Sequence, residues 1–293
     1  MITGNILLYT NEESDFGLEM THRVSAMLEK HGRLTAIFPI RYAPIYNIYP
    51  ERAPEGTPPT PELEDELSSA EMIITFGGDG TILRAARAAA ELGVPILGIN
   101  MGGKGFMAEL EVGDIDMIEL AAVGKYEIEK RMMLDVEVHR NGKLICRDFA
   151  LNDVVVKGDN KVIDLTLFGD GQKITSFAGD GAVIATPTGS TAYSMAAGGP
   201  IVEPSAHNII VTPICAHMLE AKSFVLVPDR CVSVEIGWKK HNPAYMSVDG
   251  CDHVDIKVGD AIKIRKSSKH ARLVRLTDKS FYKKVSDKLT IGN

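Results

Sequence analysis

MIITFGGDGTILRAARAAAEL, residues 72–92, is the stretch of sequence that decides the fold. Residues 72–76 are mostly apolar and suit a buried strand, and residues 81–92 suit a helix. Between them, Gly77, Gly78 and Gly80 allow a tight turn. A strand that passes through a tight turn into a helix is the building unit of an α/β fold with a parallel sheet.

The neighbouring segments repeat this alternation. We expect strands at 5–9, 35–39 and 95–100, and a helix at 19–31 that stops at Gly32. The proline-rich segment 42–66 excludes a regular element and predicts an exposed loop. We therefore predict an α/β N-terminal domain, Rossmann-like with a mostly parallel sheet, in which ligands bind at the carboxyl ends of the strands.

From about residue 125 the apolar pattern changes its period. Leu134, Val136 and Val138 alternate with polar residues, and the hairpin signal Asn141-Gly142 follows. Similar short runs continue to about residue 272, with one helical stretch at 190–197. The alternation predicts an all-β C-terminal domain, β-sandwich-like in character.

Length and composition are those of a globular protein. The chain has 293 residues, 45% of them hydrophobic and 24% charged, and a formal charge of −7. The acidic balance argues against nucleic acid or a membrane surface as a partner. The four cysteines form no CxxC pair, so neither a zinc site nor a disulfide framework is indicated. Without a signal-peptide pattern or a membrane-length apolar run, we expect a cytoplasmic protein.

Asp79 is the acidic residue inside the glycine turn. Glycines and a helix start present backbone N–H groups that bind phosphate, and Arg84 lies one turn further on, within reach of an anion. Because a carboxylate repels phosphate, Asp79 fits a role beside the phosphate, taking a proton from a sugar hydroxyl or holding a metal ion. The alternative is structural: Asp79 caps the following helix, whose N-cap we otherwise assign to Thr81.

A second polar cluster lies in DGAVIATPTGSTAYSMAAGGPIVEP, residues 180–204. An apolar strand leads into a turn rich in hydroxyl groups, among them Thr188 and Ser190, and then into a short helix. Such hydroxyls and N–H groups suit sugar and phosphate oxygens, and Tyr193 offers a ring for a base. In the first half, Phe106 is also available to pack on a ring. Ordinary capping of a strand–turn–helix unit is the alternative.

Together these motifs resemble the NAD kinase family. The similarity rests on GGDGT (77–81), GINMGGKGFMAEL (98–110), ALND (150–153) and residues 180–201, and it continues through SVDG (247–250) to residues 279–289. Members transfer the terminal phosphate of ATP, or in some cases polyphosphate, to the adenosine-ribose 2′-hydroxyl of NAD. They require a divalent cation, for which we expect Mg²⁺, and they assemble as homodimers or homotetramers.

The resemblance implies two domains and a role for particular residues. The nucleotide- and phosphate-binding domain is 1–124 with 273–293, and the NAD-binding domain is 125–272. Asp79 becomes the general base, or the residue that orients the 2′-hydroxyl. Asn152 and Asp153 contact ribose hydroxyls of NAD, and Asp180 binds the nicotinamide end. No residue is assigned to a metal. The other predicted binding residues are Gly77, Gly78, Gly80, Arg84, Phe106, Thr188, Ser190, Thr191, Ala192, Tyr193, Ser194 and Asp249.

Three positions depart from the family pattern. Asp153 replaces a frequent glutamate, Ala216 stands before His217 where the family has proline, and Cys251 replaces a common glutamine. These changes concern ligand contacts rather than the transfer chemistry.

Two alternatives share part of the pattern. A lipid kinase of the diacylglycerol or sphingosine type also has GGDGT and a β-rich second domain, and a non-catalytic NAD-binding regulator would not need Asp79. The sequence does not give the phosphoryl donor range, the preference between NAD and NADH, allosteric regulation or the subunit number.

Overall fold

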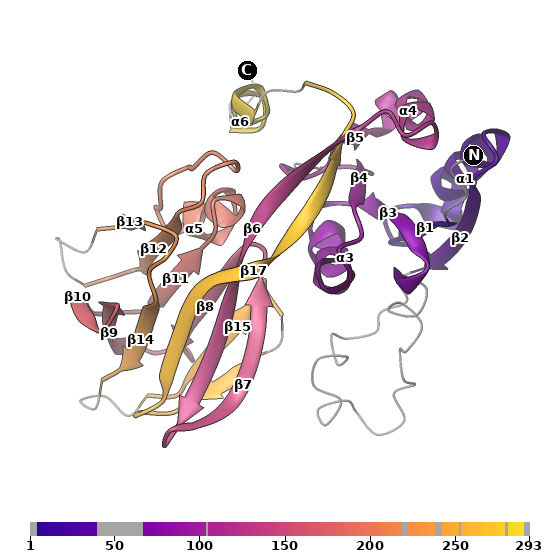
Figure 1. The fold of residues 1–293 in the computed structure, drawn as a ribbon. Coiled ribbons are helices and arrows are strands. Elements are labelled where there is room, and N and C mark those ends of the chain that lie inside the picture. The colour runs from indigo at the N-terminus through magenta and orange to yellow at the C-terminus, as the bar shows by residue number, and fades with distance from the viewer. Residues whose placement is uncertain are drawn as a thin grey trace. The chain divides into compact units, whose positions relative to one another are not determined.

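The chain divides into two compact units. Unit 1 is Met1–Lys130 with Ala271–Asn293, and unit 2 is Arg131–His270. The computed structural model (Figure 1) describes residues 5–39, 67–103, 105–217, 222–237, 242–251, 253–278 and 281–289. The predicted proline-rich loop at 42–66 lies outside the described residues. The domain limits predicted from the sequence differ by a few residues, because the chain passes between the units within two long strands, β6 (Glu127–Arg140) and β17 (Ala261–Arg275).

Unit 1 contains a parallel sheet in the order β2-β1-β3-β4, with the last residues of β17 and the short β5 beside β4. The strands alternate with helices along the chain. This confirms the predicted α/β, Rossmann-like architecture. The strands are β1 (Asn5–Thr10), β2 (Leu34–Pro39), β3 (Ala70–Gly77), β4 (Ile96–Asn100) and β5 (Leu110–Glu111).

Helices cover both faces of this parallel sheet. On one face, Leu28 and Ile118 belong to a buried cluster with Ile74 and other strand residues. On the other face, Ile82 packs so closely on β4 that a Cβ on Gly98 would lie 2.5 Å from its Cδ1. The helices of unit 1 are α1 (Glu19–Lys30), α3 (Asp79–Leu92), α4 (Ile118–Ala122) and α6 (Phe281–Leu289), with 3₁₀ turns at Phe16–Leu18 and Val112–Met117.

The buried carboxylate of Glu109 attaches the C-terminal segment to unit 1. Its Oε1 accepts the N–H groups of Leu276 and Thr277 at 3.0 and 2.9 Å, and the Thr277 hydroxyl at 2.7 Å. Arg275 Nη1 donates to Oε2 at 3.1 Å. Hydrogen bonds to a charged group are stronger than neutral ones, so this single side chain fixes the path of the chain after β17.

Unit 2 is built from two sheets. The first has six strands in the order β13-β12-β11-β8-β15-β16, and every pair is antiparallel. Its strands are β8 (Asp153–Gly158), β11 (Gly181–Ala185), β12 (Ile209–Ile214), β13 (Phe224–Leu226), β15 (Ala244–Val248) and β16 (Val254–Ile256). The second sheet contains β6, β17, β7 (Lys143–Ala150), β9 (Ile163–Gly169), β10 (Gln172–Gly179) and β14 (Val232–Ile236).

The central strands of the six-stranded sheet, β8, β11 and β12, are buried on both faces along most of their length. Val155 and Val183 point to one face, where Ala197 and Val202 pack on them after the 3₁₀ turn Thr188–Thr191 and the short helix α5 (Tyr193–Ala196). Ile184 points to the opposite face and is also buried, and β11 contacts β9 of the second sheet. The predicted all-β, β-sandwich-like domain is confirmed by these antiparallel sheets.

Candidate functional site

The glycine turn joins β3 to α3 in unit 1. The strand ends at Gly77 and the helix begins at Asp79, with Gly78 as its N-cap. The predicted N-cap, Thr81, lies inside the first turn instead. Its side chain is buried against Gly77, where a Cβ would be 2.2 Å from Thr81 Oγ1, so it does not act as the N-cap. Gly77 is therefore required by local packing.

The Asp79 carboxylate is held by a second loop of the same unit. Phe106 N–H donates to Oδ2 at 2.7 Å and Met107 N–H donates to Oδ1 at 3.1 Å. A Cβ on Gly105 would lie 2.8 Å from Oδ1, so this loop passes directly over the carboxylate. No side-chain bond caps α3, and the alternative that Asp79 is the helix cap is wrong. Each carboxylate oxygen has two lone pairs, so each keeps one for a ligand beside its N–H donor.

The other two glycines of the turn face open space. A Cβ on Gly78 or Gly80 would meet no atom within 4 Å, and neither residue has a positive φ. The fold itself therefore does not require glycine at either position. Inside a helix, Gly80 is even destabilising by roughly 0.5–1 kcal/mol relative to alanine. Close approach of a ligand to the helix start gives a reason for both glycines.

Arg84 is exposed one turn beyond Asp79. Burial raises the pKa of Tyr9, near the end of β1, to about 12, and the charge of Arg84 opposes this rise. The guanidinium thus lies near the carboxyl end of β1, at the edge of a parallel sheet where ligands bind. The predicted residues Asp79, Arg84 and Phe106 all belong to this part of unit 1.

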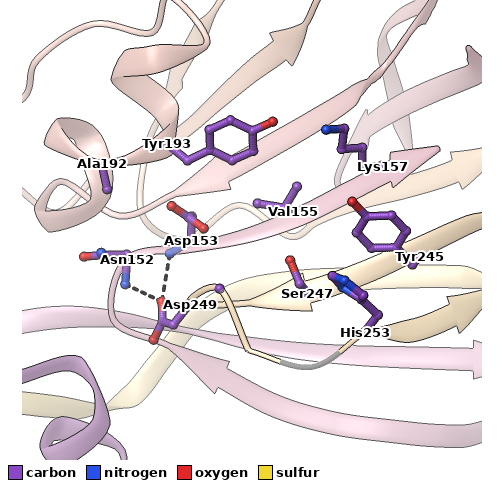
Figure 2. Close-up of a pocket in the computed structure, with 11 residues that line it drawn as sticks. Asn152, Asp153, Val155, Lys157, Ala192, Tyr193, Tyr245, Ser247, Asp249 and His253 are labelled. Carbon is purple, nitrogen blue, oxygen red and sulfur yellow. Dashed lines mark hydrogen bonds between the residues drawn. The ribbon is translucent and has the colours of Figure 1, made fainter. Parts of the chain in front are cut away.

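Unit 2 contains a pocket of about 360 Å³ on one face of its six-stranded sheet (Figure 2). This volume suits a group of nucleotide size. Of the predicted binding residues, Asn152, Asp153, Ala192, Tyr193 and Asp249 line it. The other lining residues are Val155, Lys157, Tyr245, Ser247, Gly250 and His253.

Strand register explains how this pocket is formed. Asp153, Val155 and Lys157 are spaced two apart on β8, so their side chains leave the same face of the sheet. In the antiparallel pair with β15, Ser247 lies opposite Val155, and Tyr245 lies opposite Lys157. Directly opposed residues share a face, so the floor of the pocket combines two strands that are far apart in the sequence.

Asp249 orders the backbone that carries two of the predicted ribose-binding residues. Its carboxylate accepts the N–H groups of Leu151 at 2.8 Å, Asn152 at 2.7 Å and Asp153 at 3.0 Å. The Asp249 N–H in turn donates to the Asp153 carbonyl oxygen at 2.9 Å. These bonds fix the turn that leads into β8. A direct ligand contact of Asp249 stays a prediction.

Asp153 is buried, with 4% of its surface exposed, and lines the pocket. Burial, and then the negative charge of Asp249, raise the pKa of its carboxyl group to about 7. Within the described part of the chain, that carboxyl group makes no hydrogen bond. Figure 2 shows it pointing into the pocket, on the side of Tyr193. A buried acceptor without a donor is costly, so a ligand hydroxyl at this place would be stabilising.

The hydroxyl-rich turn at 188–194 is held by internal hydrogen bonds. Ser190 Oγ donates to main-chain carbonyl oxygens at 2.7 and 3.1 Å. Ser194 Oγ lies 3.1 Å from Thr212 Oγ1, and Arg131 Nη1 donates to Thr188 Oγ1 at 3.2 Å. Thr188, Ser190 and Ser194 are buried. Their hydroxyls support the turn that forms one wall of the pocket, and their contacts with a ligand stay predictions.

Two further predicted residues, Asp180 and Thr191, do not line this pocket. Asp180 precedes β11, where its N–H donates to the Ile214 carbonyl oxygen at 3.0 Å. Thr191 Oγ1 donates to the Thr188 carbonyl oxygen at 3.3 Å. Their roles in ligand binding remain predictions.

Sequence reasoning missed four polar residues of the pocket: Lys157, Tyr245, Ser247 and His253. The alternation along β8 was the available signal for Lys157, because it shares a face with Asp153. The rings of Tyr245 and His253 are in contact in a tilted arrangement, with centroids 4.1 Å apart and an interplanar angle of 45°. Nothing in their sequence neighbourhood shows that they face the same cavity.

A glycine turn at the carboxyl end of a parallel sheet, with a polar pocket that has an aromatic wall, defines a nucleotide-binding protein. The family model for the ATP-NAD kinase N-terminal domain matches residues 12–122, and that for the C-terminal domain matches residues 151–276. The NAD kinase of Ruminiclostridium cellulolyticum is 35% identical over 287 residues, 96% of each chain. That of Natranaerobius thermophilus is 42% identical over 228 residues, 76% of this chain and 79% of its own. The chain belongs to the NAD kinase family.

Two solved structures have a similar fold. The yeast NADH kinase, crystallised with NADH, has a TM-score of 0.81 at 22% identity, covering 99% of this chain and 89% of its own. An NAD kinase from Archaeoglobus fulgidus in complex with ATP has a TM-score of 0.73 at 27% identity, covering 98% and 100%. The predicted family and enzyme class are confirmed by these comparisons, and they do not favour a lipid kinase or a non-catalytic regulator.

Proposed function

We propose that this protein transfers the terminal phosphoryl group of ATP to the 2′-hydroxyl of the adenosine ribose of NAD, which gives NADP. Membership of the NAD kinase family supports this reaction. The structural observation that supports it most is the setting of Asp79. Its half-buried carboxylate stands at the start of α3, is fixed by two N–H groups, and has glycines with open space on both sides.

In this proposal Asp79 accepts the proton of the 2′-hydroxyl. A ribose hydroxyl is a weak nucleophile until its proton is removed, and a carboxylate at hydrogen-bond distance does this as the bond to phosphorus forms. The bonds from Phe106 and Met107 restrict the carboxylate to one orientation. Positioning and electrostatic stabilisation supply most of the acceleration of phosphoryl transfer, and no covalent intermediate with the protein is needed.

The phosphates of ATP are assigned to the glycine turn. Gly78 and Gly80 leave room at the start of α3, where backbone N–H groups and the helix dipole favour an anion, and Arg84 adds a positive charge. Gly77 holds the turn in shape.

The divalent cation is expected to be Mg²⁺. In the described ranges, no three His, Cys, Asp or Glu side chains come together as a metal site. This fits an ion that is bound chiefly by nucleotide phosphates and one or two carboxylates, and Asp79 is the carboxylate of the glycine turn. When bound, such an ion neutralises charge on the transferring phosphoryl group.

NAD is assigned to the pocket of unit 2. The buried carboxyl of Asp153 would accept a ribose hydroxyl, with Asn152 beside it, and the ring of Tyr193 would stack on a base. Ala192 would leave space for that base. The remaining assignments, of Asp180 to the nicotinamide end and of Thr188, Ser190, Thr191, Ser194 and Asp249 to the frame around the nucleotide, follow the family resemblance.

The expected assembly follows from the same resemblance. We infer a homodimer or homotetramer in the cytoplasm, with small-molecule substrates and neither nucleic acid nor membrane as a partner. The net charge of −7 supports the exclusion of nucleic acid. None of the helices in the described ranges has the length and apolar character needed to cross a membrane.

The test is a direct assay. Purified protein with ATP, Mg²⁺ and NAD should form NADP, measured with an NADP-specific dehydrogenase, whereas 2′-deoxy-NAD should give no product because the acceptor is missing. Diacylglycerol and sphingosine should remain unmodified. Phosphorylation of a lipid without NADP would favour the lipid kinase. NAD binding by calorimetry without any turnover would favour the non-catalytic regulator.

A further inference from the structure

Two side chains of opposite charge line the pocket of unit 2 and do not pair with each other. Asp153 begins β8, and Lys157 lies four residues further on the same strand and the same face. Four residues of a strand span roughly 13 Å, which keeps the two charged groups apart. Neither side chain forms an ion pair or a hydrogen bond with any other residue in the described ranges.

Lys157 is half-buried and is the sole Lys or Arg among the described residues that line this pocket. Tyr245 lies directly opposite it on β15, and its ring contacts that of His253 at a centroid distance of 4.1 Å. In Figure 2 the amine of Lys157 and the hydroxyl of Tyr245 lie at the same end of the pocket, apart from Asp153. This end therefore presents hydrogen-bond donors, one of them charged.

The two ends of the pocket favour different groups of one ligand. A carboxyl group without a donor favours a ligand hydroxyl, and a half-buried ammonium without a counter-charge favours an anion. A nucleoside phosphate carries hydroxyls and an anionic group close together. An oxidised nicotinamide ring, which is positively charged, would be repelled by Lys157.

We propose that Lys157 binds a phosphate of the dinucleotide substrate, with the Tyr245 hydroxyl as a second donor, while Asp153 accepts a hydroxyl of the adjoining ribose. This inference rests on the proposed function, because it takes the nucleotide in this pocket to be NAD. It adds a substrate-binding residue at the opposite end of β8 from the predicted pair, Asn152 and Asp153.

The titration of Asp153 is compatible with a phosphate in the same pocket. Burial and the charge of Asp249 raise the pKa of its carboxyl to about 7, so near neutral pH this group is protonated in part of the molecules. A partly neutral carboxyl repels a nearby anion less than a fully ionised one.

The experiment compares Lys157→Met with Lys173→Met, which removes an exposed lysine of the same unit from β10, outside the pocket. NAD and ATP binding are measured by calorimetry, and adenosine binding by ligand-observed NMR. Lys157→Met should weaken NAD binding about tenfold to hundredfold, the usual worth of a charged hydrogen bond, and leave adenosine binding unchanged. Lys173→Met should change neither NAD binding nor adenosine binding.

Two further variants sharpen the comparison. Lys157→Arg keeps the positive charge and should retain most of the wild-type NAD affinity, and Tyr245→Phe should weaken NAD binding by about two- to tenfold.

Several results would overturn the inference. Equal losses of NAD and adenosine binding would mean that Lys157 only shapes the pocket, and unchanged NAD binding would remove its role altogether. A loss of ATP binding with NAD binding intact would assign the phosphate to the other substrate. If Lys157→Met does not fold, Tyr245→Phe decides instead: a loss of NAD affinity with adenosine binding unchanged supports the inference, and unchanged NAD binding overturns it. NADP formation by the wild type is scored separately, so failure of the proposed function is distinguishable from failure at Lys157.

Discussion

The glycine turn of unit 1 and the pocket of unit 2 use the same device in different ways. In each, an aspartate accepts backbone N–H groups from a segment that is distant in the sequence. Asp79 accepts those of Phe106 and Met107, which lie 27 and 28 positions after it, and Asp249 accepts those of residues 151–153, which lie 96 to 98 positions before it. Around Asp79 the other candidate residues follow one another in the chain. Around Asp249 they come from separate strands and meet through register. A site formed by consecutive residues can be predicted from the sequence, whereas a site assembled by strand pairing is predicted only in part.

The carboxyl groups of Asp249, Asp79 and Asp153 also differ in how many protein hydrogen bonds they accept, and so in what they offer a ligand. Asp249 orients three consecutive backbone N–H groups, Asp79 is held by two and stands beside open space, and the side-chain carboxyl of Asp153 makes no hydrogen bond within the described part of the chain. We infer that the first is a positioning residue, the second acts in the transfer, and the third binds substrate.

Replacement of Asp79 should have the largest effect. Asp79→Asn removes the proton acceptor, and we expect the turnover number for NADP formation to fall about 10²–10⁴-fold. The matched control is Glu119→Gln, which neutralises an exposed carboxylate of α4 and should leave turnover unchanged. Wild-type turnover in Asp79→Asn would remove this residue from the chemistry.

Gly105→Ala tests the position of the same carboxylate without removing it. The new Cβ would lie 2.8 Å from Asp79 Oδ1, so the carboxylate or the loop must shift. Turnover should fall about tenfold to hundredfold, since misplacement by about 1 Å has effects of this size. Gly113→Ala, where a Cβ meets nothing within 4 Å, is the control. Equal rates in the two variants would show that the loop does not position Asp79.

Asp249→Asn should act on stability. An amide offers one acceptor oxygen where the carboxylate serves three N–H groups, so the free energy of unfolding should fall by about 1–3 kcal/mol. NAD affinity should fall with it. Thermal and urea unfolding, with the exposed Asp229→Asn as control, measure this. An unchanged unfolding midpoint would contradict the positioning role.

Gly80→Ala should separate stability from ligand binding. Because Gly80 is helical and a Cβ there meets no atom within 4 Å, alanine should raise the free energy of unfolding by about 0.5–1 kcal/mol. If ATP phosphate occupies that space, KM for ATP should rise about tenfold, a change of ~1.4 kcal/mol. A more stable variant with an unchanged KM would place the phosphate elsewhere.

A pH dependence of stability is expected from Asp153. Its pKa is raised from 3.8 to about 7 on folding, so between these values the folded state binds more protons than the unfolded state. This contribution to stability is fully present below about pH 4 and is lost as pH rises through about 7. Melting temperatures of the unliganded protein, measured from pH 5 to 8, should fall more steeply in the wild type than in Asp153→Asn. Parallel curves would contradict the raised pKa.

Much of the fold was predictable, because it depends on local patterns. The apolar run 72–76, the glycines and the following helix predict the parallel α/β unit, and alternation after residue 125 predicts the antiparallel one. The start of α3 was misplaced at Thr81 because a buried threonine has the same sequence signature as a capping one.

The candidate site was predictable only in part. Asp79 stood out because glycine alone is enough to make a tight turn, so an added carboxylate indicates either a helix cap or a chemical role. Its bonds to the loop at 105–107 were not visible, because they depend on tertiary contact. Lys157 and Tyr245 were missed because their proximity is set by the register of β8 with β15, which a sequence pattern does not specify.

The central claim is that the glycine turn supplies the chemistry of transfer and the pocket of unit 2 supplies the affinity for NAD. Its most direct test is a calorimetric titration of NAD into Asp79→Asn. If Asp79 acts on the 2′-hydroxyl while the pocket of unit 2 supplies the affinity, the dissociation constant for NAD should stay within about twofold of the wild-type value, although turnover is lost. A dissociation constant that weakens as much as kcat/KM falls would show that Asp79 is a binding residue and would contradict this division.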